Sequence, residues 1–157
     1  MSKEEKTNVM RVLERKKISY ESHSYEPDAT MSGEQIAGIL GGDPKKVFKT
    51  LVTRGKSGAY YVFVVPVEAE LDLKKAAKAA GEKVISMIKQ KELLPLTGYI
   101  HGGCSPIGMK KQFPTFIHDT ATSFDMVFVS AGKVGFQIEL TPEDLISVAG
   151  CQVADIV

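Results

Sequence analysis

The chain has 157 residues, of which 43% are hydrophobic and 25% charged, and its formal net charge is +1 at pH 7. This composition predicts one globular domain over residues 1–157, and it is too weakly basic for a protein that grips nucleic acid unaided through many phosphate contacts. The first residues form no apolar signal segment, and no later apolar run approaches the roughly 18 residues of a membrane span. We therefore expect a cytoplasmic protein that makes no membrane contact.

Cysteine and histidine give no metal pattern. Cys104 and Cys151 make neither a disulfide framework nor a metal-ligand spacing, and the three histidines show no HxxxH pattern. We expect neither a metal nor another cofactor. The motifs GxGxxG and GxxxxGK[ST] are absent after the predicted strands, which argues against the usual nucleotide-binding folds.

The first third of the chain predicts two helices with a strand between them. Apolar residues at helical spacing indicate an amphipathic helix over residues 5–17, followed by a short strand over residues 18–25. Ser32 and Gln35 are spaced as a capping box and begin a second helix. The glycine pair after residue 40 should end this helix.

A hairpin and two further helices follow. Residues 47–54 and 59–66 are β-branched and aromatic runs joined by the sequence GKSG, which predicts a hairpin. Asp72 can cap a helix that runs to Gly81, and residues 89–94 indicate another short helix.

The last third repeats the strand pattern and closes with a helix. Strands are expected over residues 115–119, 126–131 and 134–140, after which Thr141 and Pro142 begin the helix as N-cap and first residue. Helices interleaved with hairpins favour an α/β (α+β) fold, with a mixed, partly antiparallel sheet or barrel surrounded by helices, over a doubly wound parallel sheet.

Lys49 lies in the middle of the apolar strand VFKTLV. Alternation puts Lys49 and Thr50 on opposite faces of this strand, and both faces are otherwise apolar. Lysine is almost never buried without a partner, so its ammonium should be paired, desolvated or directed into a cleft. A lysine that reaches solvent near the strand end is the alternative. The central position favours a functional lysine.

Two glycine-rich segments and one cysteine are further candidates. GYIHGGCSPIGMKK, residues 98–111, suggests strained backbone or close approach to a bound group. The segment around Ser130 fits either a tight hairpin or N–H groups presented to an oxyanion. Cys104 is a possible nucleophile, with His101 or His118 as base and Asp119 to orient it, although a small buried thiol is the simpler interpretation.

Four segments in collinear order carry a resemblance to one family. VFKTL, PVEAELDLKKAAKAAG, TGYIHGGCSPIGMKK and VFVSAGKVGFQIEL resemble the YbaK family of bacterial aminoacyl-tRNA deacylases, whose relatives include the editing insertion domain of prolyl-tRNA synthetase. The resemblance covers nearly the whole chain, from KISYESHSY to the final helix. It implies a mixed, β-barrel-like fold with surrounding helices. It also implies a trans-editing hydrolase that deacylates mischarged tRNA(Pro), above all Cys-tRNA(Pro).

The same resemblance implies which residues form the site. The catalytic group it implies consists of Lys49, Gly102 and Ser130. The residues expected to bind substrate are Tyr25, Thr50, Gly103, Ser105 and Gln137. Many members carry an acidic residue where this chain has Gln137, a departure that bears on the fine substrate preference.

The mechanism and the partners are also implied by the family. The resemblance implies an enzyme that has no side-chain nucleophile. In such an enzyme the thiol of the substrate's own cysteine attacks the ester. The resemblance also implies action on tRNA held together with prolyl-tRNA synthetase in a ternary complex, an expectation that suits a net charge of only +1. Two lysine pairs, which could otherwise be ordinary solvated side chains, are expected to contact the tRNA backbone: Lys45 and Lys46, and Lys110 and Lys111.

Three alternative functions remain open at this point. The first is an editing deacylase of different specificity, acting on Ala-tRNA(Pro). The second is a non-catalytic module that binds tRNA or a synthetase, for which loss of Lys49 would be the sign. The third is a hydrolase that uses Cys104 as its nucleophile.

Overall fold

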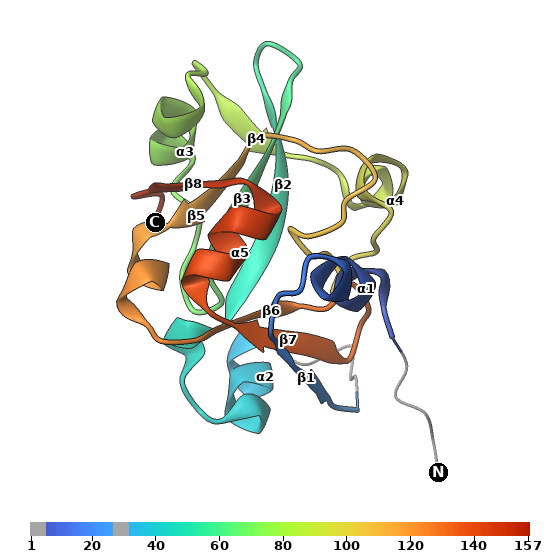
Figure 1. The fold of residues 1–157 in the computed structure, drawn as a ribbon. Coiled ribbons are helices and arrows are strands. Elements are labelled where there is room, and N and C mark those ends of the chain that lie inside the picture. The colour runs from blue at the N-terminus through green and yellow to red at the C-terminus, as the bar shows by residue number, and fades with distance from the viewer. Residues whose placement is uncertain (1–5, 27–31) are drawn as a thin grey trace.

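The computed structural model describes residues 6–26 and 32–157, which form a mixed α/β structure (Figure 1). The helices in these residues are α1 (Asn8–Arg15), α2 (Gly33–Leu40), α3 (Leu73–Ala80), α4 (Gln90–Thr97) and α5 (Pro142–Ala149), with the short 3-10 helices η1 (Pro44–Lys46) and η2 (Asp119–Ser123). The strands are β1 (Glu21–Ser24), β2 (Phe48–Gly55), β3 (Tyr60–Pro66), β4 (Ile85–Met87), β5 (Thr115–His118), β6 (Val127–Ser130), β7 (Phe136–Leu140) and β8 (Cys151–Ala154).

The strands form two sheets. One has the order β4-β2-β3-β5-β8, in which β2 pairs antiparallel with β3 and β4, whereas β5 runs parallel to β3 and β8. The other has the order β1-β7-β6 and is antiparallel throughout. The predicted mixed, partly antiparallel α/β class is confirmed, and the strands of the described residues are divided between two sheets, neither of which closes into a barrel.

Most predicted elements are present, with shifted ends. α1 is shorter than the expected helix over residues 5–17, because the Thr7 side chain caps it by accepting a hydrogen bond from the Met10 N–H; residue 5 lies outside the described residues. The capping box of α2 and the Asp72 cap of α3 are both confirmed. β4 and β8 were not predicted, since each is short and lies at a sheet edge.

Alternation along β3 divides the core between the two faces of the larger sheet. Val62 and Val64 pack in a cluster that includes residues of α1, α5 and the smaller sheet. Phe63 and Val65 point to the other face, where they pack against the alanines of α3. All four side chains are fully buried, so both faces of this central strand are covered.

The two sheets meet at the beginning of β2. Val47 forms an isolated parallel bridge with Phe128 of β6, and α2 packs over this junction through Ala37. In Figure 1, α2 lies at the lower end of the molecule, beyond β6 and β7. Within the described residues, none of the helices has the length and apolar character that crossing a bilayer requires.

Candidate active site

The first half of β2 has an open edge. β4 pairs only with Thr53, Arg54 and Gly55, so in the described part of the chain residues 48–51 have no strand partner on that side. A cavity of about 310 Å³ opens beside this edge. We call it the Lys49 pocket; β2, β6, β7, the start of α2 and the loop around Gly102 all contribute to its lining.

Lys49 and Thr50 both line this pocket. The sequence predicts that they point to opposite faces of β2, yet a cavity at the edge of a strand can be reached from both faces. Lys49 is half-buried, and among the described residues no carboxylate lies within 4.0 Å of its ammonium. The Oγ1 atom of Thr50 is buried and has no hydrogen-bond partner among the described residues.

Ser130 and Gln137 form the opposite wall. They are a directly paired couple on the antiparallel strands β6 and β7, and both line the Lys49 pocket. The Ser130 hydroxyl oxygen accepts a hydrogen bond from the Gly132 N–H at 3.1 Å, which leaves its own hydroxyl hydrogen available to a ligand. Gln137 is only 7% exposed, and no group within residues 6–26 and 32–157 forms a hydrogen bond with its Oε1 atom.

The two neighbouring glycines of the 98–111 loop have different roles. Gly102 lines the pocket, and its φ of +87° lies in the left-handed region that favours glycine. Gly103 is buried and is not among the lining residues. A Cβ atom on Gly103 would lie 3.0 Å from the backbone nitrogen of Val134, so this glycine lets the loop pack closely against the β6–β7 turn.

Two other predicted substrate-binding residues lie outside the lining of the Lys49 pocket. Ser105 is completely buried, and its hydroxyl accepts a hydrogen bond from the Ile107 N–H, so it stabilises the turn of the loop. Tyr25 is half-buried and donates its backbone N–H to the Gly135 carbonyl beyond the end of β1. Neither hydrogen bond places the side chain of Ser105 or of Tyr25 in contact with the Lys49 pocket.

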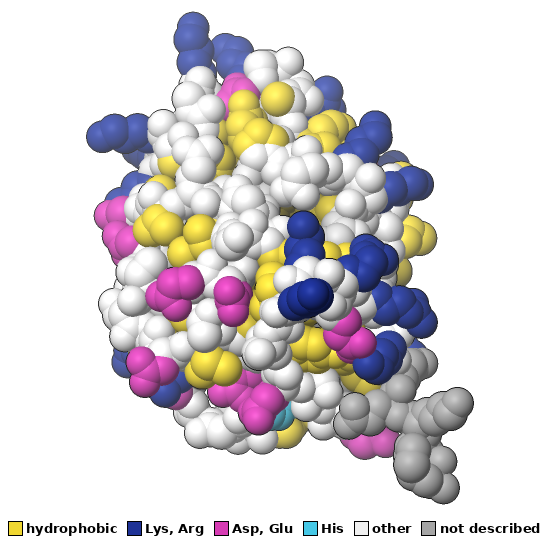
Figure 2. All heavy atoms as spheres, viewed as in Figure 1, with side chains coloured by type: hydrophobic (Ala, Val, Ile, Leu, Met, Phe, Trp, Pro, Cys, Tyr) yellow, Lys and Arg dark blue, Asp and Glu magenta, His cyan; other side chains and the backbone are white. Residues whose placement is uncertain are grey.

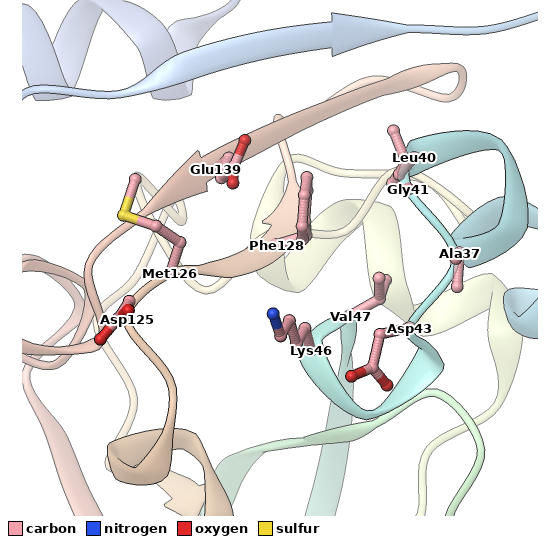
Figure 3. A pocket seen from close by; sticks show the side chains of 11 residues that line it. Ala37, Leu40, Gly41, Asp43, Lys46, Val47, Asp125, Met126, Phe128 and Glu139 are labelled. Carbon is pink, nitrogen blue, oxygen red and sulfur yellow. The ribbon is translucent and has the colours of Figure 1, made fainter.

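The four lysines predicted to contact tRNA are all exposed but lie in different settings. Lys110 and Lys111 end the glycine-rich loop that contributes to the Lys49 pocket. Lys46 instead lines a separate cavity of about 270 Å³, the Lys46 pocket, together with three acidic residues: Asp43, Asp125 and Glu139. Figure 3 shows this pocket, with Lys46 directed into the space between Asp125 and Phe128.

Charge is unevenly distributed on the molecular surface. In the view of Figure 2, most lysine and arginine side chains lie at the top and along the side that carries α1 and α4, whereas acidic side chains lie mainly over the opposite and lower parts. The total charge is nevertheless only +1. On the face shown in Figure 2, a polyanion would therefore be attracted to the side that carries the lysine and arginine side chains.

Cys104 is unsuited to act as a nucleophile. It lines the Lys49 pocket but is only 8% exposed, and burial raises the pKa of its thiol to about 12. Burial likewise raises the pKa of Cys151 to about 12. Because the thiolate is the reactive form, both side chains are protonated and unreactive near neutral pH.

Several lining residues were not predicted. Ile36 of α2 and Val67 after β3 form apolar wall, and His101 lies at the boundary of the pocket. No local sequence pattern identifies Ile36 and Val67 as lining residues, because their position near Lys49 depends on how α2 packs. The sequence suggests His101 only as a base for Cys104, although its position next to the glycine pair Gly102 and Gly103 is a local signal for a place in the pocket.

One side-chain cluster outside the Lys49 pocket could hold a metal. The carboxylates of Glu21 and Glu139 and a ring nitrogen of His23 lie within 4.8 Å of one another across β1 and β7. His23 Nε2 and Glu139 Oε1 are 3.0 Å apart, so a hydrogen bond already joins two of the three groups. The sequence gives no metal-ligand spacing here, and the cluster is separate from Lys49.

Comparison with known proteins supports an editing role. The family model described as the aminoacyl-tRNA editing domain matches residues 26–148. The chain is 47% identical over 154 residues to EbsC of Enterococcus faecalis, named as a candidate Cys-tRNA(Pro)/Cys-tRNA(Cys) deacylase, with 98% of this chain and 94% of the relative covered.

Solved structures share the fold. A crystal structure of a candidate trans-editing enzyme for prolyl-tRNA synthetase superposes with a TM-score of 0.81 at 25% identity, covering 97% of this chain and 98% of the other. The crystal structure of the hypothetical protein APE2540 gives a TM-score of 0.85 at 22% identity, covering 94% and 97%. Together these findings confirm the predicted family and the predicted class of enzyme, an aminoacyl-tRNA deacylase. The chain belongs to the aminoacyl-tRNA editing domain family.

Proposed function

We propose that this protein, acting as one domain over residues 1–157, removes cysteine from mischarged tRNA(Pro) in trans, with the Lys49 pocket as its active site. The observation that carries the proposal is a pair of buried oxygens in residues that line that pocket, Thr50 Oγ1 and Gln137 Oε1, neither of which has a hydrogen-bond partner among the residues that the structure describes. Buried polar atoms are normally hydrogen-bonded, and leaving one unpaired costs about 1–3 kcal/mol. A ligand that donates hydrogen bonds at these atoms would remove that cost.

An aminoacyl ester carries a suitable donor. Its α-ammonium group has three N–H donors and no acceptor, which complements the acceptor Oε1 of Gln137. A neutral amide at this position binds an ammonium less strongly than a carboxylate would. Recognition of the amino acid therefore depends more on the shape of the pocket and on its apolar wall, to which Ile36 and Val67 contribute.

Lys49 and Ser130 supply polar stabilisation of the reacting ester. Attack on the carbonyl carbon produces a negatively charged oxygen, and a preorganised donor at such an oxygen contributes roughly 3–4 kcal/mol to catalysis. The Lys49 ammonium has no carboxylate partner among the described residues, so its charge is available to the substrate. The free hydroxyl hydrogen of Ser130 can donate a second hydrogen bond.

The nucleophile comes from the substrate. The cysteine thiol loses its proton, its sulfur forms a bond to the carbonyl carbon, and the ester C–O bond breaks. The released tRNA hydroxyl takes up the proton, and water then hydrolyses the cyclic thioester to free cysteine. This route suits a pocket whose own Cys104 has a pKa of about 12.

Delivery of the substrate uses a partner. A protein with a net charge of +1 makes few phosphate contacts, so we propose a ternary complex with tRNA(Pro) and prolyl-tRNA synthetase. In that complex Lys110 and Lys111 contact the tRNA backbone. Aminoacyl-tRNA is made and used in the cytoplasm, which is where we expect the reaction.

Amino-acid release tests the proposal directly. Purified protein is incubated with cysteinyl-, alanyl- and prolyl-tRNA(Pro) and with cysteinyl-tRNA(Cys), and the free amino acid is measured over time. We expect the fastest release from Cys-tRNA(Pro). Faster release of alanine would support the alternative specificity, and no release from any of the four would support a non-catalytic module.

A further inference from the structure

A second hollow adjoins the Lys49 pocket. It measures about 220 Å³, and we call it the Met87 pocket. The two pockets share the lining residues Thr50, Leu51 and His101. When the reacting group of a ligand occupies the Lys49 pocket, the neighbouring part of the same ligand can therefore occupy the Met87 pocket.

The Met87 pocket has apolar walls and an exposed rim. Met87, Ile88 and Leu93 line it, and Met87 is 48% exposed at the end of β4. Leu94 and Ile100 are the sequence neighbours of the lining residues Leu93 and His101. They are also large and apolar, and they are 53% and 55% exposed. Apolar walls with an exposed apolar side chain such as Met87 are typical of a binding site.

Polar and charged groups add chemical detail. Gln90 lines the hollow with a side chain that both donates and accepts hydrogen bonds, and His101 contributes an aromatic ring. Lys89 and Lys91 flank Gln90 and are exposed. The site therefore combines an apolar wall, an amide and nearby positive charge, which matches a nucleotide: a flat base attached to a phosphate.

We propose that the Met87 pocket binds the adenine ring of the 3′-terminal nucleotide of tRNA, an inference that rests on the proposed function of the Lys49 pocket. The ester joins the amino acid to the ribose of that nucleotide, so its base lies one sugar away from the reacting carbonyl. The ribose then lies at the boundary formed by Thr50, Leu51 and His101. The thioether of Met87 packs against the base, and Gln90 pairs with its edge.

The Lys46 pocket is a poorer site for the same group. Its lining includes the carboxylates of Asp43, Asp125 and Glu139 and the ammonium group of Lys46. These charges repel a phosphate chain. Lys49, Thr50 and Gln137 line the Lys49 pocket but not the Lys46 pocket. A base bound in the Lys46 pocket would therefore not lie next to the reacting ester.

A binding measurement that requires no catalysis tests this assignment. Isotopically labelled protein is titrated with adenosine 5′-monophosphate and, separately, with uridine 5′-monophosphate, and backbone amide shifts are followed by NMR. We expect shifts at residues 87–93 and at His101, larger for the adenine nucleotide. Shifts confined to the Lys46 pocket, no shifts, or equal shifts with both nucleotides would overturn the assignment.

Substitutions in the hollow give the second test. Met87→Ala combined with Gln90→Ala should weaken binding of adenosine 5′-monophosphate and raise KM for Cys-tRNA(Pro) about tenfold, with kcat within twofold. Both side chains are exposed, so folding should be retained, as circular dichroism can verify. The matched control is Val153→Ala, at a 45% exposed apolar residue of β8 on the far edge of the sheet.

The outcomes separate this inference from the proposed function. If wild-type protein releases cysteine and the double variant keeps the wild-type KM, the adenine site is wrong and the deacylase proposal stands. If wild-type protein releases no amino acid, the deacylase proposal fails, and the nucleotide titration still decides whether the hollow binds adenine.

Discussion

Thr50 of β2 and Gln137 of β7 belong to different sheets, yet they line one pocket, and each buries an oxygen that has no hydrogen-bond partner in the described part of the chain. The two sheets meet beside this pocket through the Val47–Phe128 bridge. A fold optimised only for stability would pair or remove such oxygens. In the proposed function, a bound substrate would supply the missing hydrogen-bond donors.

Replacing Thr50 with valine should make the protein more stable and less active. The substitution removes an unpartnered buried hydroxyl, which should raise the free energy of unfolding by about 1 kcal/mol, while amino-acid release slows. The matched control is Thr53→Val on the same strand. The Thr53 hydroxyl donates to the Tyr61 carbonyl at 2.9 Å, so its loss should lower stability by about 1 kcal/mol. Urea denaturation measures both, and equal changes in the two variants would contradict the prediction.

Lys49→Ala should lower kcat for Cys-tRNA(Pro) by about 10²–10³-fold, the loss expected when a charged donor to the oxyanion is removed. The fold should be retained, because among the described residues the ammonium has no ion-pair partner to lose. Lys56→Ala, at an exposed lysine in the β2–β3 turn, serves as the control. Single-turnover release of cysteine is the measurement, and near wild-type rates in Lys49→Ala would exclude this residue from the site.

Replacing both cysteines, Cys104 and Cys151, with serine should leave deacylation within a few-fold of wild type. Burial raises the pKa of both thiols to about 12, so neither provides a thiolate at neutral pH. An enzyme that used one of them as a nucleophile would lose several orders of magnitude in kcat. A loss of that size, with an unchanged circular dichroism spectrum, would identify a cysteine nucleophile.

The same pKa values predict how stability depends on pH. A thiol whose pKa rises from 9.0 in the unfolded chain to about 12 in the folded protein stabilises the fold below pH 9, and this contribution is lost as the pH rises towards 12. The double serine variant lacks both groups. Its unfolding free energy should therefore fall less than that of wild type between pH 9 and pH 12, as measured by urea denaturation. Parallel curves for the two proteins would show that the thiols are not buried in this way.

Seryl-tRNA(Pro) should be a far poorer substrate than cysteinyl-tRNA(Pro). A pocket that selected by size alone would separate these near-isosteric amino acids by only about 1–3 kcal/mol. Loss of an attacking thiolate costs more, because a hydroxyl group is scarcely ionised at neutral pH. Rates are compared on the same tRNA body, and comparable values would mean that water is the nucleophile.

Lys110 and Lys111 should govern the salt dependence of tRNA binding more than Lys45 and Lys46 do. The first pair ends the loop that lines the Lys49 pocket, whereas Lys46 shares its pocket with three acidic residues. Replacing Lys110 and Lys111 with alanine should reduce the slope of log K against log salt by about 1–2. Binding is measured with and without prolyl-tRNA synthetase, which should tighten it in wild type. Tight binding of isolated tRNA at physiological salt, unaffected by the synthetase, would argue against the ternary complex.

The sequence alone determined the elements whose signals are local. Ser32, Asp72 and Thr141 cap their helices as predicted, because an N-cap depends on a few neighbouring residues. The hairpin of β2 and β3 followed from two β-branched runs around a short turn. The collinear resemblance likewise identified the family, since it rests on residue order rather than on spatial contacts.

Only the tertiary structure decided which of the candidate residues meet. Lys49, Thr50, Gly102, Ser130 and Gln137 come together in one pocket because two separate sheets join at Val47, whereas Tyr25, Gly103 and Ser105 remain outside its lining. Strand alternation predicts that Lys49 and Thr50 point to opposite faces of β2, but the open edge of β2 exposes both residues to the same cavity. The short strands β4 and β8 form through pairing with distant residues, so no local pattern could predict them.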